Sequence, residues 1–208
     1  MDYRLNFLKQ YLVGHKTELD NEDQVLKKCC ELAYSDMLTV GRFFLDKREG
    51  LRNKVIETFL IELKKCNYSY SHGLIDKLTE LFGNKKIEKH FAKTREKGGK
   101  EKSFEYDDYV TTFGLCQKFV NMCFKYFYVF VDNLPTINFS FGKCDCPIDS
   151  VILKKLRISK SYTWSKLNKK EYEDIQILIQ EKQDKDSKYK QLQHIGRLAF
   201  DFINWVNY

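Results

Sequence analysis

Proline is almost absent from this chain, and that scarcity limits the folds open to it. Pro135 and Pro147 are the only two prolines in 208 residues, and glycine occurs ten times. Turn-rich β folds need many residues that interrupt regular structure, whereas long helices exclude proline from their interiors. The sequence therefore predicts a mainly α-helical protein, long enough for one compact domain or for two small helical lobes.

The most apolar helical pattern follows Gly114. Apolar residues recur there at spacings of three and four, namely Leu115, Phe119, Met122, Cys123, Tyr126 and Phe130. This period predicts a helix with one broad apolar face, on which Lys118 and Lys125 lie two turns apart. A second helix is predicted to begin after Cys146-Pro147-Ile148-Asp149, because proline suits a first helical turn and Asp149 can cap the helix.

Similar periods predict a helix that is capped by Asn21 and carries its apolar residues over 25–33, and helices over 52–66 and 74–82. A further helix is predicted to begin with Asn168 and Glu171 as a capping box. A last apolar segment, 192–205, is expected to pack back on the domain. The stretch 96–103 is charged, contains two glycines and lacks an apolar period. We therefore expect a flexible loop there, between an N-terminal lobe (1–95) and a C-terminal lobe (104–208), unless the chain forms a single domain.

Positive charge is unevenly distributed along the chain. The formal net charge is +7, and residues 85–102 contain eight Lys or Arg against three acidic residues. Such a cluster attracts polyanions by releasing their counterions, which points to nucleic acid as the partner. The candidate DNA contacts are Lys85, Lys86, Lys89, Lys93 and Arg95. The alternative is an ordinary solvated surface, since runs of charge often serve solubility alone.

Cysteine usage and hydropathy indicate the compartment. The chain has seven cysteines, an odd number, and its first residues lack the apolar core of a secretory signal, so we expect reduced thiols in a cytoplasmic protein. The cysteines lack the paired CxxC spacing of zinc or iron–sulfur sites, and we expect neither a metal nor a cofactor. No apolar run approaches the roughly 20 residues that cross a bilayer. We therefore expect a soluble monomer without membrane contacts.

Two short motifs resemble those of the helix-hairpin-helix DNA glycosylase superfamily. The run Gly114-Leu115-Cys116-Gln117-Lys118 is similar to its hairpin and following helix, in which a glycine stands four residues before the catalytic lysine. The run Cys146-Pro147-Ile148-Asp149 is similar to its Pro-hydrophobic-Asp motif. The 31 residues from Lys118 to Asp149 resemble most the archaeal branch of the 8-oxoguanine glycosylases.

The resemblance implies a two-lobed helical fold and a reaction of base excision in DNA repair. Lys118 would attack the sugar of a damaged base such as 8-oxoguanine, with or without AP lyase activity, and Asp149 would stabilise the positive charge that develops. Gly114 and Gln117 would contact DNA. Phe139, Phe141 and Trp164 are the expected walls of the pocket for a flipped base.

Several alternatives stay open at this point. Lys125 competes with Lys118 for the role of nucleophile, Asp132 and Asp145 are weaker candidates than Asp149, and Asp149 can be a helix cap without any catalytic role. The usual hairpin also carries a proline and a second glycine, which this chain lacks. That difference favours a second hypothesis, a non-catalytic factor of a mobile element or defence system that binds nucleic acid or protein. Under the first hypothesis, Lys118 and Asp149 must lie within about 10 Å of each other.

Overall fold

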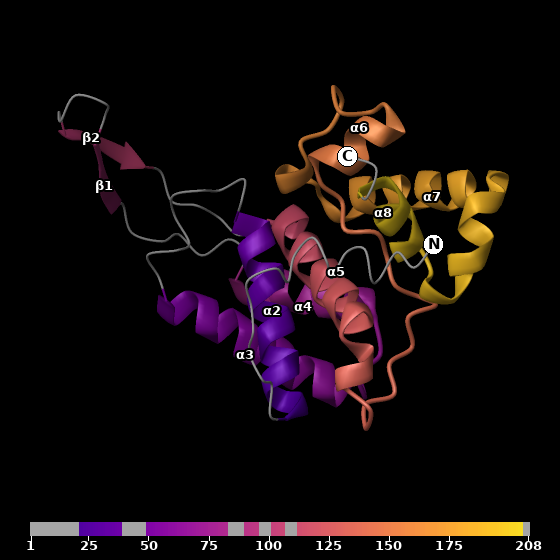
Figure 1. Ribbon diagram of the computed structural model, residues 1–208. Helices are drawn as coiled ribbons and strands as arrows, with labels where there is room; N and C mark the ends of the chain where they lie inside the picture. The colour runs from indigo at the N-terminus through magenta and orange to yellow at the C-terminus, as the bar shows by residue number, and fades with distance from the viewer. Residues whose placement is uncertain (1–20, 39–48, 83–89, 96–100, 107–111, 206–208) are drawn as a thin grey trace.

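A computed structural model describes residues 21–38, 49–82, 90–95, 101–106 and 112–205. The helices, labelled as in Figure 1, are α2 (Glu22–Leu38), α3 (Glu49–Lys65), α4 (His72–Phe82), α5 (Phe113–Val129), α6 (Ser150–Leu156), α7 (Lys169–Lys185) and α8 (Leu198–Trp205). Three 3-10 helices join them: η1 (Val131–Asn133), η2 (Trp164–Lys166) and η3 (Ser187–Ile195). The prediction of a mainly helical protein is confirmed.

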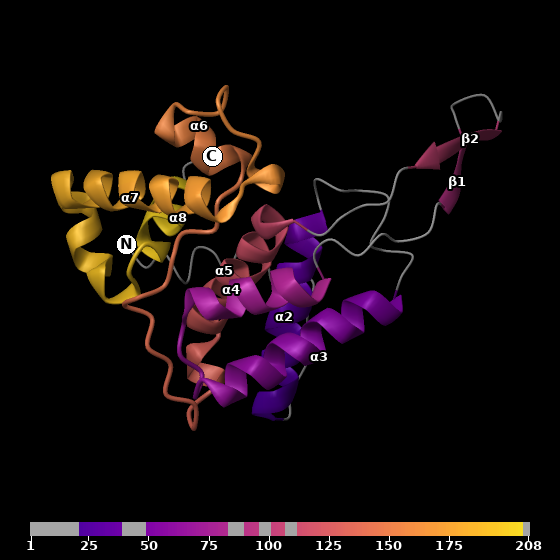
Figure 2. The same cartoon turned by 180° about the vertical axis from the view of Figure 1, so that it is seen from behind.

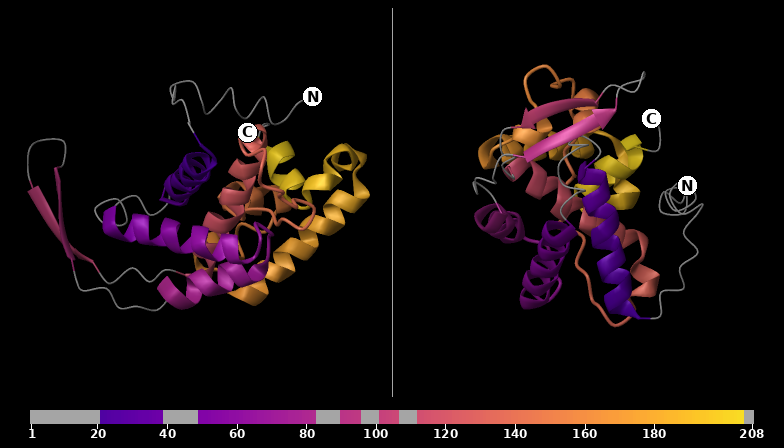
Figure 3. Two further views of the ribbon diagram at one scale, coloured as in Figure 1. Left: turned by 90° about the horizontal axis from the view of Figure 1, so that it is seen from below. Right: turned by 90° about the vertical axis from the view of Figure 1, so that its left-hand side faces the viewer.

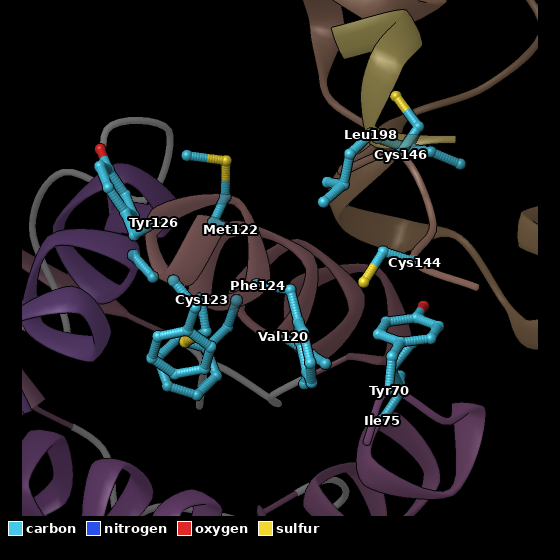
Figure 4. Packing of buried hydrophobic residues seen from close by; sticks show 14 of the residues in the cluster. Tyr70, Ile75, Val120, Met122, Cys123, Phe124, Tyr126, Cys144, Cys146 and Leu198 are labelled. Carbon is cyan, nitrogen blue, oxygen red and sulfur yellow. The ribbon is translucent and has the colours of Figure 1, made fainter. Parts of the chain in front are cut away.

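Helix α5 runs through the centre of the molecule. Figures 1 and 2 show α2, α3 and α4 on one side of it and α6, α7 and α8 on the other. Every residue from Gly114 to Phe127 is buried, which corrects the expectation of a single apolar face. In Figure 4, Met122 and Tyr126 leave α5 on one side, and Val120 and Phe124 leave it on another. A helix covered on all sides must pair its buried polar side chains with partners on other elements.

The local signals for helix ends are largely confirmed. The side chain of Asn21 accepts a hydrogen bond from Gln24 N at the start of α2, and Asn168 and Glu171 form the expected capping box of α7. The last apolar segment is two elements, not one. Gly196 separates η3 from α8 with a φ of +59°, and a β-carbon there would lie 2.7 Å from the carbonyl oxygen of Gly142. Both the turn and the close approach require glycine.

One antiparallel hairpin lies apart from the helices. Strand β1 (His90–Arg95) pairs with β2 (Glu101–Tyr106), with Arg95 opposite Glu101, and Figure 3 shows the pair beside the helical body. Residues 101–103 were expected to be flexible loop and belong instead to β2. Their backbone pairing with 93–95 accounts for the difference, because the charged residues carry no strand period that would reveal it.

Helices from both sides of the predicted lobe boundary pack against α5. Helices α2 and α4 precede the boundary and contact α5, and so do η2 and α7, which follow it. The division into two lobes stays a prediction. Within the described residues, no helix is long and apolar enough to cross a membrane.

Candidate active site

Lys118 and Asp149 are brought together by the starts of two helices. Lys118 lies in the second turn of α5, whose N-terminus is capped by Thr112. Asp149 caps α6, as the sequence predicts: its Oδ1 accepts hydrogen bonds from Val151 N at 2.9 Å and Ile152 N at 3.0 Å. Its other oxygen, Oδ2, accepts a hydrogen bond from Lys118 Nζ at 2.7 Å. The carboxylate is thus divided between a backbone cap and a lysine.

This ion pair retains a small contact with solvent. The side chains of Lys118 and Asp149 are 9% and 12% exposed. The competing lysine, Lys125, forms an ion pair with Asp201, and both of those side chains are only 1% exposed. Lys125 Nζ also lies 5.1 Å from the centre of the Trp205 ring. Of the two lysines, Lys118 is therefore the one that a substrate can reach with little rearrangement.

The electrostatics of the pair favour an ionised carboxylate. Burial by itself raises the pKa of Asp149, but the Lys118 ammonium and the Ile152 N–H outweigh burial and hold that pKa below its usual value. In the buried pair between Lys125 of α5 and Asp201 of α8, burial prevails over the effect of Lys125 and raises the pKa of Asp201. Asp149 is thus the better of the two carboxylates for stabilising a positive charge at neutral pH.

Two glutamines hold the segment that delivers Asp149. Gln117 donates to Ile148 O at 2.9 Å and accepts from Ile148 N at 3.2 Å. Gln176 on α7 pairs with Cys146 in the same two-bond manner, at 2.7 and 3.2 Å. Each amide side chain replaces the hydrogen bonds that a neighbouring strand would make, so segment 144–149 is held in place although it is not part of a sheet.

Asp145 anchors the other end of that segment. Its side chain is fully buried, and its Oδ2 accepts from Tyr172 OH at 2.6 Å and lies 2.7 Å from His72 Nε2. Oδ1 accepts from Arg197 Nε at 2.7 Å. Burial raises the pKa of Asp145, yet these donors together lower it, and the hydrogen bond with Asp145 raises the pKa of His72. Asp145 is fully buried, and its partners are His72, Tyr172 and Arg197 instead of a candidate nucleophile, so it has a positioning role and is no rival to Asp149.

The expected aromatic pocket is only partly assembled. Trp164 is buried, and Lys118 Nζ lies 5.4 Å from the centre of its ring. Phe139 and Phe141 stack on each other, and Phe139 stacks on Phe127. Nine helical residues separate Phe127 from Lys118, a distance of roughly 14 Å along α5. Phe139 and Phe141 therefore pack the core near the other end of α5, and Trp164 alone borders the ion pair.

The expected DNA contacts on α5 face the protein interior. Gly114 is buried, and a β-carbon on it would overlap the carbonyl oxygen of Trp164. Gln117 is fully buried in its pairing with Ile148. Both residues thus position other parts of the site. Of the predicted basic contacts, Lys93 and Arg95 belong to β1, and Lys85, Lys86 and Lys89 lie outside the described residues.

Sequence reasoning missed His72, Gln176 and Arg197, which help to hold the site together, and considered Asp145 only as a weaker alternative to Asp149. His72, Asp145, Gln176 and Arg197 come from four separate segments, and no local spacing marks them as partners. A polar residue inside a short apolar run was the one available signal, and Gln176 between Ile175 and Ile177 is such a residue.

Comparisons with known proteins do not identify a family for this chain. No protein-family model matches the chain, and neither a curated protein nor a solved structure matches it. The resemblance to the helix-hairpin-helix glycosylases therefore rests on the two short motifs alone, and any function must be argued from the geometry of the site.

Proposed function

We propose that this protein is a DNA glycosylase in which Lys118 is the nucleophile and Asp149 its acidic partner. The observation that carries the proposal is the 2.7 Å ion pair between Lys118 Nζ and Asp149 Oδ2, formed by residues 31 positions apart. The hypothesis required these side chains to lie within about 10 Å. Their slight exposure and the neighbouring Trp164 ring are compatible with a nucleotide reaching them from one side.

Each group in the pair has a chemical task. A lysine attacks only as a neutral amine, and the nearest acceptor for its proton is Asp149 Oδ2. The freed amine would form a bond to the sugar C1′ as the bond from C1′ to the base breaks, with its electron pair leaving on the base. The base would then take the proton from Asp149. Once it has given up this proton, Asp149 is again ionised, and its carboxylate, held by two backbone N–H groups, would stabilise the positive charge on the amine that is now bonded to C1′.

A second candidate function is favoured by the surroundings of Gly114 and Gln117. Both are occupied by contacts within the protein, so the hairpin region lacks the DNA contacts that the resemblance implies. A non-catalytic factor that binds nucleic acid or protein needs no such contacts. In that case the Lys118–Asp149 pair would serve only to join α5 to the start of α6.

Borohydride trapping distinguishes the two functions. Wild-type protein would be incubated with duplexes that contain 8-oxoguanine, an abasic site or neither, and reduced to capture the imine formed by a lysine nucleophile. We expect an adduct that is lost in Lys118→Gln, whose amide can still donate a hydrogen bond to Asp149. The matched control is Lys182→Gln, an exposed lysine on α7. Circular dichroism verifies that each variant is folded.

The outcomes are separable. An adduct of unchanged yield in Lys118→Gln refutes the lysine nucleophile. Absence of any adduct from wild-type protein that still binds DNA supports the non-catalytic function. Asp149→Asn provides a further check, because it should lower the rate of adduct formation while leaving DNA affinity close to that of the wild type.

A further inference from the structure

The chain that follows Asp149 has an unusual charge composition. From Ser150 to Lys170 it contains no aspartate or glutamate and seven basic residues: Lys154, Lys155, Arg157, Lys160, Lys166, Lys169 and Lys170. We call residues 150–170 the cationic segment. It includes α6, the loop after it, η2 and the first two residues of α7.

Three of these side chains are suited to bind an external anion. Lys169 is paired with Asp76 at 2.7 Å and Lys170 with Asp174 at 2.8 Å. Arg157, Lys160 and Lys166 are exposed. Among the residues that the structure describes, no acidic side chain forms an ion pair with any of these three, so their charge is available to a partner.

The cationic segment meets the candidate active site at two points. Its first residue follows Asp149, and its η2 residue Trp164 lies next to Lys118 Nζ. Thr112 donates a hydrogen bond to Ser165 O, and Gly114 leaves room for the backbone of Trp164, so η2 is held against the start of α5. Figure 2 shows α6 and the loop after it beyond this end of α5. Arg157 and Lys160 are thus carried on a loop between two fixed points beside the ion pair.

We propose that the cationic segment binds the phosphate backbone of a nucleic acid on either side of a nucleotide presented to Lys118 and Asp149. This inference rests on the proposed function and adds the binding surface. Arg157 and Lys166 are nine residues apart in the chain, so an anion with repeating charges suits them better than a single phosphate. A nucleic-acid strand supplies one charge about every 3.4 Å. An anionic membrane surface also carries repeating charges, but it has no nucleotide that could extend to the recessed ion pair.

The test is the salt dependence of DNA binding. Fluorescence anisotropy would measure the affinity for a labelled duplex with an abasic-site analogue between 50 and 200 mM salt. If Arg157, Lys160 and Lys166 each contact a phosphate, the triple glutamine variant should reduce the slope of log K against log salt by about 2.7. Across this range the variant should then lose roughly 40-fold less affinity than the wild type.

The matched control removes three charges elsewhere. Lys182, Lys185 and Lys190 are exposed near the other end of α7, a helix about 25 Å long, and their triple glutamine variant should keep the wild-type slope. An equal reduction in both triple variants would overturn the proposal, as would an unchanged slope in the first. Binding to phosphatidylserine vesicles without binding to DNA would overturn it as well.

Failure of this proposal and failure of the proposed function give different results. The wild-type protein could show a steep salt slope that depends on the cationic segment but form no borohydride adduct. This result would refute the glycosylase function and support the binding surface. An adduct together with an unchanged slope in the triple variant would support the glycosylase function and refute the binding surface. If the triple variant does not fold, Lys160→Gln and Lys166→Gln alone should each reduce the slope by about 0.9.

Discussion

Replacing Gly114 with alanine should destabilise the protein, although the same change in a helix is usually stabilising. Alanine has a helix propensity up to about 1 kcal/mol better than glycine. At Gly114, however, the new β-carbon would overlap Trp164 O and lie 2.9 Å from Ser165 C and 3.0 Å from Leu167 N. All three are backbone atoms, so η2 as a whole must move away from α5.

The size of the effect follows from these two opposing contributions. Forcing a methyl group into a packed interior costs about 1–3 kcal/mol, and a clash with three backbone atoms, which cannot rotate away, belongs in the upper part of that range, about 2–3 kcal/mol. Subtracting the gain in helix propensity leaves a loss of about 1–2 kcal/mol in the free energy of unfolding. For a chain of this length, that corresponds to a decrease in Tm of about 2–8 °C. Urea denaturation and differential scanning calorimetry can both resolve a change of this size.

Gly73 provides a matched control, because it is the second residue of α4 just as Gly114 is the second residue of α5. A β-carbon on Gly73 would meet only the Oγ of Ser71, at 3.3 Å, and that hydroxyl can rotate away. Gly73→Ala should therefore leave the stability unchanged or raise it by up to about 1 kcal/mol. Equal or greater stability of Gly114→Ala relative to the wild type would refute the packing of η2 on α5. In a Trp205→Phe background, the emission of Trp164 reports the displacement directly.

Three other perturbations test the frame around the site. Lys125→Met should cost about 3–5 kcal/mol in urea denaturation, because Asp201 is left buried without its partner, and a Lys125→Met/Asp201→Leu double variant should recover most of the loss; equal loss in both would contradict this. Because Asp145 raises the pKa of His72, their interaction should stabilise the fold fully below the unfolded-state pKa of about 6.5 and less as the pH rises through the folded-state value. The difference in stability between wild type and His72→Gln should therefore shrink between about pH 6 and 8, and a constant difference would refute the link. Asn168→Ala should lower stability by about 1 kcal/mol through loss of the capping box, whereas Asn168→Ser should retain most of it, as thermal denaturation can show.

Local features of the site could be predicted because their causes are local. The cap formed by Asp149 depends on backbone N–H groups two and three residues away, so Asp149 signals a helix start without any knowledge of the fold. Pro147 was expected in the first helical turn but lies two residues before this cap, outside α6. The helical period around Lys118 likewise arises within one element. The break at Gly196 was missed because the apolar period continues across it, and only the approach of Gly142 shows that the chain turns there.

By itself, the sequence determined that this protein is helical, where most of its helices begin, and that Lys118 lies on one helix and Asp149 at the start of another. The tertiary structure alone decided that the two side chains meet, because their contact spans 31 residues and depends on Gln117, Gln176 and Asp145 holding the intervening segment. The tertiary structure also decided that Lys125 is fully buried whereas Lys118 keeps a small contact with solvent. Burial depends on which elements cover a helix, so the sequence around two lysines on the same helix does not predict which of them is exposed.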